Sequence, residues 1–496
     1  MLRQLAGQSV IYGISSIVAR LLNYLLTPYL THIMSPSEYG VVADMYALIP
    51  FALVLLTMGL ETGYFRFAGR AGDAAGKKRV FTTAWGMVTC LALGFMALVL
   101  LFRTPVAAAA GEVYVANSSF ITIVAGIIAL DVISAIPFAR LRAEGRAARF
   151  VVVRIASVVV NVSLCSFFCG ALPHLAAGGG FFATIWNPGF GAGYVFVANL
   201  IASLVALLLL LPSCRGALPK IDGKVLRTML LYSLPLLVSG IAGTANEFID
   251  RQMIKFLMPE DVAMGAVGIY GAVVKTGVIL LLFTQMYRLA AEPFFLASFK
   301  KEDFLSTNAE ALKYFVIVSV GIFLLITLFM DDFALILGRD FREGMFILPI
   351  VLLANIFSGI VLNLSFWYKQ SGATRFAIYV TSTGLVVTVA ANFVLVPRFG
   401  YAGAAWARLL CEATMVALSY YFNRKHFPTP YDLRRIGGYF LLGGGCYALG
   451  FLSIELPVMA KYCVNLLLVS LFALYVVRRE RIDVAGVFKS IIKRVR

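Results

Sequence analysis

The sequence predicts an all-α polytopic membrane protein, and three observations carry this prediction: high hydrophobicity, regularly spaced apolar runs and alternating loop charge. Of the 496 residues, 61% are hydrophobic and only 14% are charged, and the mean hydropathy is +0.89. An average soluble domain carries about 25% charged residues. A water-soluble fold of this size could not bury so much apolar surface, so the lipid bilayer must act as the solvent.

Fourteen stretches are long and apolar enough to cross a bilayer as helices, each of which needs about 20 residues. The predicted spans are 8–31, 41–64, 80–102, 117–139, 150–172, 192–212, 227–257, 268–290, 310–330, 345–367, 376–397, 402–422, 436–453 and 459–477. The first run begins near Ser9, behind only Arg3, and continues well past the length of a signal peptide. We therefore expect it to be retained as a transmembrane helix.

Basic residues collect in every second loop, as the positive-inside rule requires. With the N-terminus in the cytoplasm, the main basic cytoplasmic segments are 66–79, 140–149, 214–224, 423–435 and the tail 478–496. The outer loops hold only Arg103, Arg339, Arg342, Arg398 and Lys461. One missed or additional helix would destroy this alternation, so we expect both termini in the cytoplasm. The net charge of +17 then reflects topology and contact with membrane lipids, and it does not indicate nucleic acid.

Few side chains are suited to catalysis or metal binding. None of the seven cysteines forms a CxxC pair, and the histidines His32, His174 and His426 lie far apart. We expect no catalytic residue, no metal site and no cofactor. The largest candidate loops, 171–190 and 331–344, are too short for an extramembrane domain, which argues against a membrane glycan polymerase.

A weak internal repeat predicts two similar halves. "RAARF" at 146–150 is echoed by "GATRF" at 372–376, and an offset of 224 pairs Ser9 with Ser233 and Tyr46 with Tyr270. Six helices per half is an even number, so the halves are parallel repeats related by a pseudo-two-fold axis along the membrane normal, and they enclose a central cavity. The predicted parts are six-helix lobes at 1–215 and 225–430, two additional helices in 431–478, and a basic cytoplasmic tail at 479–496.

Four stretches resemble a known family of exporters. They are "GQSVIYGISSIVARLLNYLLTPYLTHIMSPSEYG" (7–40), "RLRAEGRAARF" (140–150), "YSLPLLVSGIAGTANEFIDRQMI" (232–254) and "FWYKQSGATRFAIYV" (366–380). As an ordered set they are similar to Wzx-type polysaccharide and O-antigen flippases of the multidrug/oligosaccharidyl-lipid/polysaccharide (MOP) exporter superfamily. The resemblance implies translocation of an undecaprenyl-pyrophosphate-linked oligosaccharide from the inner to the outer leaflet of the bacterial cytoplasmic membrane. It also implies alternating access through a cationic cavity between the lobes.

Charges inside an apolar helix mark the candidate site. The stretch "NEFIDRQMIKF" (246–256) carries Glu247, Asp250, Arg251 and Lys255. Asp250 and Arg251 follow Glu247 by three and four positions and Lys255 follows Arg251 by four, which predicts that all of them lie near one helix face. A charged side chain at the bilayer centre costs about 2.5–3.5 kcal/mol on insertion scales. These side chains must therefore face the protein interior or water.

We expect four helices to bring charge to one layer in the outer half of the membrane. The residues predicted to bind the substrate pyrophosphate are Arg20, Arg251, Lys275 and Lys255, since arginine and lysine suit phosphate oxygens. Those predicted to couple an ion, with Na⁺ or H⁺ as candidates, or to pair with these cations are Asp250, Asp44 and Glu247. Arg288 and Glu292, at the cytoplasmic end of the eighth span, are gate candidates.

Structural roles compete with these assignments. Asp250 could pair with Arg20 or Lys275 and only join the lobes, while Lys255 could extend to the outer interface. Two other transporters also stay open: a lipid II flippase, whose substrate shares the pyrophosphate-lipid handle, and a MATE-type drug/cation antiporter, which would need an acidic cavity. Glycan polymerase machinery is a candidate partner of the flippase.

Overall fold

The apolar runs fold into helices because a backbone in lipid must satisfy its own hydrogen bonds. The computed structural model describes residues 24–216, 220–298, 303–373, 375–453 and 455–481, and every regular element in these ranges is helical. Ten described helices are long and apolar enough to cross a membrane, or up to eleven if the bent pair Glu260–Thr276 and Val278–Glu292 counts as one span. The all-α membrane class is confirmed, and the count of fourteen spans stays a prediction.

Predicted spans two to fourteen each coincide with described helices. These are α2 (Pro36–Thr57), α4 (Ala74–Leu101), α7 (Ser118–Ala143), α8 (Ala147–Ser166), α11 (Gly193–Leu210), α12 (Gly223–Leu257), α13 (Glu260–Thr276) with α14 (Val278–Ser298), α15 (Phe304–Leu328), α17 (Leu348–Leu364), α19 (Arg375–Phe399), α20 (Tyr401–His426), α21 (Leu433–Gly450) and α22 (Val458–Arg479). Helices α12 and α20 are not among the ten. Of the first predicted span, residues 24–31 are described and helical, and the remainder lies outside the described residues.

Shorter helices connect these spans. They are α3 (Leu60–Arg70), α5 (Arg103–Ala110), α6 (Glu112–Ala116), η1 (Phe167–Ala171), α9 (Leu172–Ala177), α10 (Phe181–Ile185), η2 (Pro188–Phe190), η3 (Leu211–Cys214), α16 (Met330–Ala334), η4 (Arg339–Ile347), α18 (Phe366–Gln370) and η5 (Phe451–Ser453).

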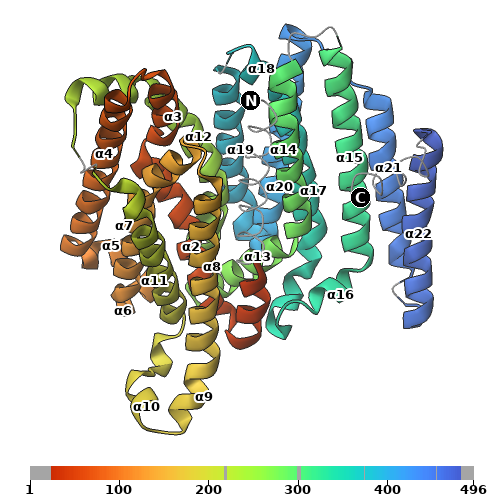
Figure 1. Cartoon of the computed structure of the whole chain (residues 1–496). Coiled ribbons are helices and arrows are strands. Elements are labelled where there is room, and N and C mark those ends of the chain that lie inside the picture. Colours follow the sequence, from red (N-terminus) through yellow and green to blue (C-terminus); the bar gives the residue numbers. More distant parts are fainter. Residues whose placement is uncertain (1–23, 217–219, 299–302, 374, 454, 482–496) are drawn as a thin grey trace, which may run out of the picture. The chain divides into compact units, whose positions relative to one another are not determined.

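The helices pack into two compact units. The first holds the chain up to Lys275 together with Leu337–Glu343 and Thr381–Ala407, and the second holds Thr276–Ile336, Gly344–Val380 and the chain from Arg408. In the first unit, α7 packs against α4 and α11, and α12 packs against α2 and α3 (Figure 1). In the second, α15 packs against α17, α21 and α22. The lobe boundaries drawn from the repeat stay a prediction.

Helix α2 begins at a capping box and ends at a left-handed turn. The Ser35 hydroxyl accepts from the Glu38 amide, and the Glu38 carboxylate accepts from the Ser35 amide. At the other end, Met58 and Gly59 have φ of 50° and 68°, which stops the helix and starts α3 at Leu60. The predicted span 41–64 is therefore broken, which the run of apolar residues alone could not reveal.

Two glycines let α2 and α13 approach closely. A Cβ added to Gly40 would lie 1.9 Å from the Met264 carbonyl oxygen, and one added to Gly268 would lie 2.0 Å from the Pro36 carbonyl oxygen. Small residues allow this kind of backbone contact between membrane helices. The contact places the Asp44 and Lys275 helices side by side.

Helix α12 starts at an aspartate cap on the predicted cytoplasmic side. The Asp222 carboxylate accepts from the Lys224 and Val225 amides at 3.0 and 3.1 Å and pairs with Arg79. The Val225 amide and then Arg79 hold the pKa of Asp222 below its ordinary value. This contact joins the ends of the basic segments 66–79 and 214–224 through Arg79 and Asp222, and the cytoplasmic placement of both segments stays a prediction.

Two predicted boundaries are wrong. Helix α8 continues through the π-helical η1 into α9, so part of the loop expected at 171–190 is helical; the Tyr29 hydroxyl donates to the Ser166 carbonyl at 3.1 Å where the wider turn begins. The span expected at 268–290 is divided at Gly277 between α13 and α14.

Candidate functional site

A buried carboxylate on α2 organises the first polar cluster. Asp44 is fully buried and accepts hydrogen bonds from the Tyr114 hydroxyl at 2.7 Å, the Lys255 ammonium at 2.8 Å and the Gln252 amide. Lys255 also lies over the rings of Tyr114 and Phe256, at 5.4 and 4.8 Å from their centroids. The ammonium group is therefore neutralised by Asp44 and held between aromatic rings.

A second cluster joins α12 to α13 and α19 around Asp250. This carboxylate is 2% exposed and accepts from the Tyr270 hydroxyl at 3.0 Å and the Asn392 amide at 3.1 Å. The Asn392 amide group also donates to the Thr388 carbonyl at 2.9 Å. Neutral donors on two other helices thus stabilise a carboxylate at a depth where an isolated charge would be costly.

Lys275 on α13 is linked to α2 through a tyrosine. Its ammonium donates to the Tyr39 hydroxyl at 3.0 Å and lies 5.3 Å from the Tyr39 ring centroid. The Tyr39 hydroxyl donates in turn to Thr27, and its ring packs edge-on against Phe341. Tyr39 is fully buried, so this cation is fixed at the crossing of α2 and α13.

The charges of α12 do not act on one face, contrary to the spacing argument. Asp250 turns to α13 and α19, whereas Gln252 and Lys255 turn to Asp44 of α2. Five residues rotate an α-helix by about 140°, which is enough to separate Asp250 from Lys255. Residues three or four positions apart lie close together on a helix, but Asp250 and Lys255 are five positions apart and therefore face different neighbours.

Two predicted site residues cannot be placed. Arg20 and the side chain of Glu247 lie outside the described residues. Arg251 is half-buried on α12 between the two clusters in sequence. The roles of Arg20, Arg251, Lys275 and Glu247 stay predictions, and for Lys255 the contact with Asp44 supports the pairing role.

The gate candidates form a small ion cluster in the second unit. Arg288 and Glu292, one turn apart on α14, approach to 3.6 Å, and Lys369 of α18 approaches the same Glu292 oxygen at 3.4 Å. All three are at least one-third exposed, so the energy of each pair is small. The cluster links α14 to α18, and the gating role stays a prediction.

A cavity of about 290 Å³ borders Lys255. It is lined by Tyr114 and Lys255 together with the acidic residues Glu112, Glu260 and Asp261. Its acidic wall is a further reason why Lys255 is better suited to pairing than to binding phosphate.

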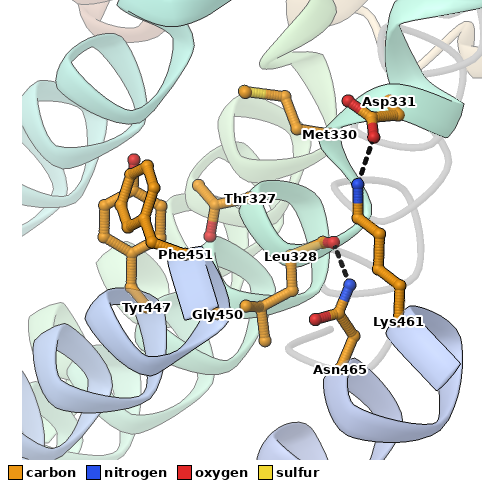
Figure 2. Close-up of a pocket in the computed structure, with 9 residues that line it drawn as sticks. All are labelled: Thr327, Leu328, Met330, Asp331, Tyr447, Gly450, Phe451, Lys461 and Asn465. Carbon is orange, nitrogen blue, oxygen red and sulfur yellow. Dashed lines mark hydrogen bonds and ion pairs between the residues drawn. The ribbon is translucent and has the colours of Figure 1, made fainter. Parts of the chain in front are cut away.

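A smaller cavity, of about 120 Å³, lies among α15, α16, α21 and α22 in the second unit (Figure 2). Figure 2 shows Lys461 directed at Asp331, and the Asn465 amide donating to the Leu328 carbonyl at 2.6 Å. These contacts link α22 to α15 and α16, and none of the predicted site residues lines this cavity.

Sequence reasoning missed the neutral members of the clusters. Tyr114, Tyr270 and Tyr39 were not singled out because aromatic side chains in spans usually face lipid or the core, and Gln252 and Asn392 carry no charge. Asn392 gave the clearest available signal, since a buried amide in an apolar helix needs polar partners.

The described residues also limit the choice of bound ion. They contain no group of three His, Cys, Asp or Glu side chains able to hold a metal. Asp250 and Asn392 supply oxygens of the type that hard cations prefer, and among the described residues the buried Asn392 carbonyl oxygen has no hydrogen-bond partner. The donor set is therefore compatible with one small cation or a proton at Asp250.

Comparison with solved structures defines the fold. A multidrug resistance MATE family transporter of the MOP superfamily, in an inward-facing conformation, matches with a TM-score of 0.69 at 14% identity, over 84% of this chain and 97% of its own. The lipid II flippase MurJ matches with a TM-score of 0.73 at 13% identity, over 95% of this chain and 100% of its own. The MATE multidrug transporter DinF-BH matches with a TM-score of 0.60 at 17% identity, over 86% and 96%. The chain thus has the fold of the MOP superfamily.

The sequence family is more specific. Residues 6–298 match the model of the family described as polysaccharide biosynthesis protein, and the chain belongs to this family. No curated protein matches. The resemblance drawn from the sequence is therefore confirmed for the polysaccharide biosynthesis family and for the fold shared with MATE and MurJ transporters.

Proposed function

We propose that the protein is a flippase that moves an undecaprenyl-pyrophosphate-linked oligosaccharide from the inner to the outer leaflet of the bacterial cytoplasmic membrane by alternating access. The observation that carries this proposal is the family match over residues 6–298, whose description concerns polysaccharide biosynthesis. The fold shared with a lipid II flippase supports it, because that protein handles a lipid-linked precursor.

The buried charges supply a physical rationale for transport. Arg251 follows Asp250 on α12, and α13, which carries Lys275, also supplies Tyr270 as a donor to the Asp250 carboxylate, so these helices bring cations and a candidate coupling carboxylate together. Lys275 is held by a neutral hydroxyl, and this leaves its positive charge available to a phosphate oxygen. We propose that Arg251, Lys275 and Arg20 contact the pyrophosphate.

Ion coupling would centre on Asp250. Tyr270 and Asn392 donate to this buried carboxylate, and the Asn392 side-chain oxygen beside it is of the type that suits Na⁺, so a proton or Na⁺ could bind here. Asp44 is a weaker candidate because Lys255 already neutralises it. Helices that bind and release an ion can shift between two arrangements when the ion favours one of them.

Lipid II is the main alternative substrate, since its pyrophosphate-lipid handle is the same and the fold of MurJ covers 95% of this chain. The two substrates differ in their sugars. A drug/cation antiporter fits less well, because the proposed contacts are cationic.

Deletion of the gene in its host tests the proposal. A flippase for polysaccharide units predicts lipid-linked oligosaccharide trapped on the inner leaflet, with lipid II transport intact. Lipid II trapped on the inner leaflet would indicate that the protein transports peptidoglycan precursors instead. Glycan that reaches the outer leaflet but stays unpolymerised would refute transport and favour a polymerase.

A further inference from the structure

A second charged cavity lies in the first unit, away from the clusters of α12. Its volume is about 620 Å³, and its charged lining residues are Lys77, Lys78, Arg140, Glu144 and Arg215. They come from the start of α4, the end of α7 and the segment after η3. Three stretches far apart in sequence therefore build one basic cavity.

The positive charge of this cavity is only partly balanced. Its one acidic residue, Glu144, is occupied by Arg140 at 2.6 Å and by Arg146 at 3.1 Å. Lys77, Lys78 and Arg215 are exposed, and among the described residues no carboxylate lies within 4 Å of any of them. An anionic ligand would meet three cations without competition from an internal acid.

Arg140 is fixed by its surroundings. Its guanidinium lies over the Phe81 ring, 4.5 Å from the centroid, and its Nε donates to Glu144. Within the described part of the chain, the Arg140 Nη1 atom is buried and has no hydrogen-bond acceptor. A buried donor of this kind favours any ligand oxygen that can reach it.

The cavity lies where lipid headgroups are expected. Its basic residues belong to the segments 66–79, 140–149 and 214–224, which the loop charges place at the cytoplasmic surface. Its lining also includes Phe65 and Phe81, so the cavity combines aromatic surface with cations. Basic pockets between transmembrane helices on this side suit anionic headgroups.

We propose that this cavity binds the phosphate group of an anionic lipid of the cytoplasmic leaflet. Two sources share that chemistry: the phosphodiester of an anionic phospholipid, and the pyrophosphate of a lipid-linked glycan. The proposal does not depend on which substrate the protein transports, because the lining residues are separate from Asp44, Asp250, Arg251 and Lys275.

The test measures lipid binding to the purified full chain in nanodiscs or by native mass spectrometry. Probes are phosphatidylglycerol, undecaprenyl pyrophosphate and, as neutral reference, phosphatidylcholine. The variant is Lys77→Gln/Lys78→Gln/Arg215→Gln, which removes exposed charges and leaves Arg140 and its contacts intact. The control removes three exposed cytoplasmic charges elsewhere, Arg424→Gln/Lys425→Gln/Arg434→Gln.

We expect the cavity variant to lose at least about tenfold in affinity for the anionic probe, whereas the control stays within about twofold of wild type. Loss for phosphatidylglycerol identifies a phospholipid site, and loss for undecaprenyl pyrophosphate alone identifies the substrate handle. Unchanged affinity of the cavity variant for both probes, or an equal loss in the control, would overturn the proposal.

Discussion

The contact between Asp44 and Lys255 gives the sharpest energetic prediction. Asp44 is fully buried and the Lys255 side chain is 8% exposed, and their charged atoms are 2.8 Å apart. Asp44→Asn keeps the size of the side chain but removes its charge, leaving a buried ammonium without its counter-ion. Lys255→Met removes the ammonium group and leaves the buried Asp44 carboxylate without its counter-ion.

The magnitude follows from burial. Removing one partner of a buried ion pair costs about 3–5 kcal/mol, whereas a polar contact inside a membrane protein is worth about 0.6 kcal/mol on average. Lys255 borders a cavity, which eases access of water, so we expect the lower limit, about 3 kcal/mol, for each single variant. The double variant Asp44→Asn/Lys255→Met leaves no unpaired charge and should cost no more than either single variant, so we expect a coupling energy of about 3 kcal/mol.

A double-mutant cycle measures this coupling from the free energy of unfolding in detergent micelles. The matched control is the pair of Asp331 and Lys461, in which the aspartate side chain is 76% exposed. Its coupling should stay below about 1 kcal/mol. A coupling for Asp44 and Lys255 that does not exceed the control would refute the assignment of a buried ion pair.

Three further predictions concern packing, the C-terminal helices and pH. Gly40→Ala should lower the free energy of unfolding by about 3 kcal/mol or more, because the added methyl group forces α2 and α13 apart. The control Gly437→Ala should cost nothing, because no atom lies within 4 Å of the added Cβ. Equal effects of the two variants would contradict the close crossing. Glu480→Gln should cost about 2–3 kcal/mol, since it leaves the buried ammonium of Lys313 on α15 without its counter-ion, and unchanged thermal unfolding would contradict this. The pKa of Asp222 is lowered in the folded protein, so the contribution of this carboxylate to the free energy of unfolding is complete at neutral pH. That contribution is lost as the pH falls below about 4 and through the folded pKa. The stability difference between wild type and Asp222→Asn should therefore shrink at low pH, and a difference independent of pH would contradict the cap.

Hydrophobic patterning was enough to predict the all-α membrane class. Each predicted span from the second onward coincides with described helices, because a bilayer allows a single solution for a long apolar segment. The breaks after Thr57 and at Gly277 were not predictable, since a left-handed turn or a bend changes neither hydropathy nor span length.

The candidate site was only partly predictable. Charges in spans are costly enough to stand out, so Asp44, Asp250, Lys255 and Lys275 were found from sequence alone. Their partners were not, because tyrosines in spans usually face lipid or the core, and Gln252 and Asn392 carry no charge that would single them out. The direction of each charge around α12 depends on which neighbouring helix offers a donor, and that is a property of the packing.

A translocation assay in vesicles tests the central claim most directly. Purified protein is reconstituted with an undecaprenyl-pyrophosphate-linked oligosaccharide, and exposure of the glycan on the opposite leaflet is followed for wild type, Arg251→Ala and Arg20→Ala. We predict transport by the wild type and a strong loss in both variants. Unchanged transport in both would contradict the cationic binding site, and no transport of any lipid-linked glycan by the wild type would contradict the flippase itself.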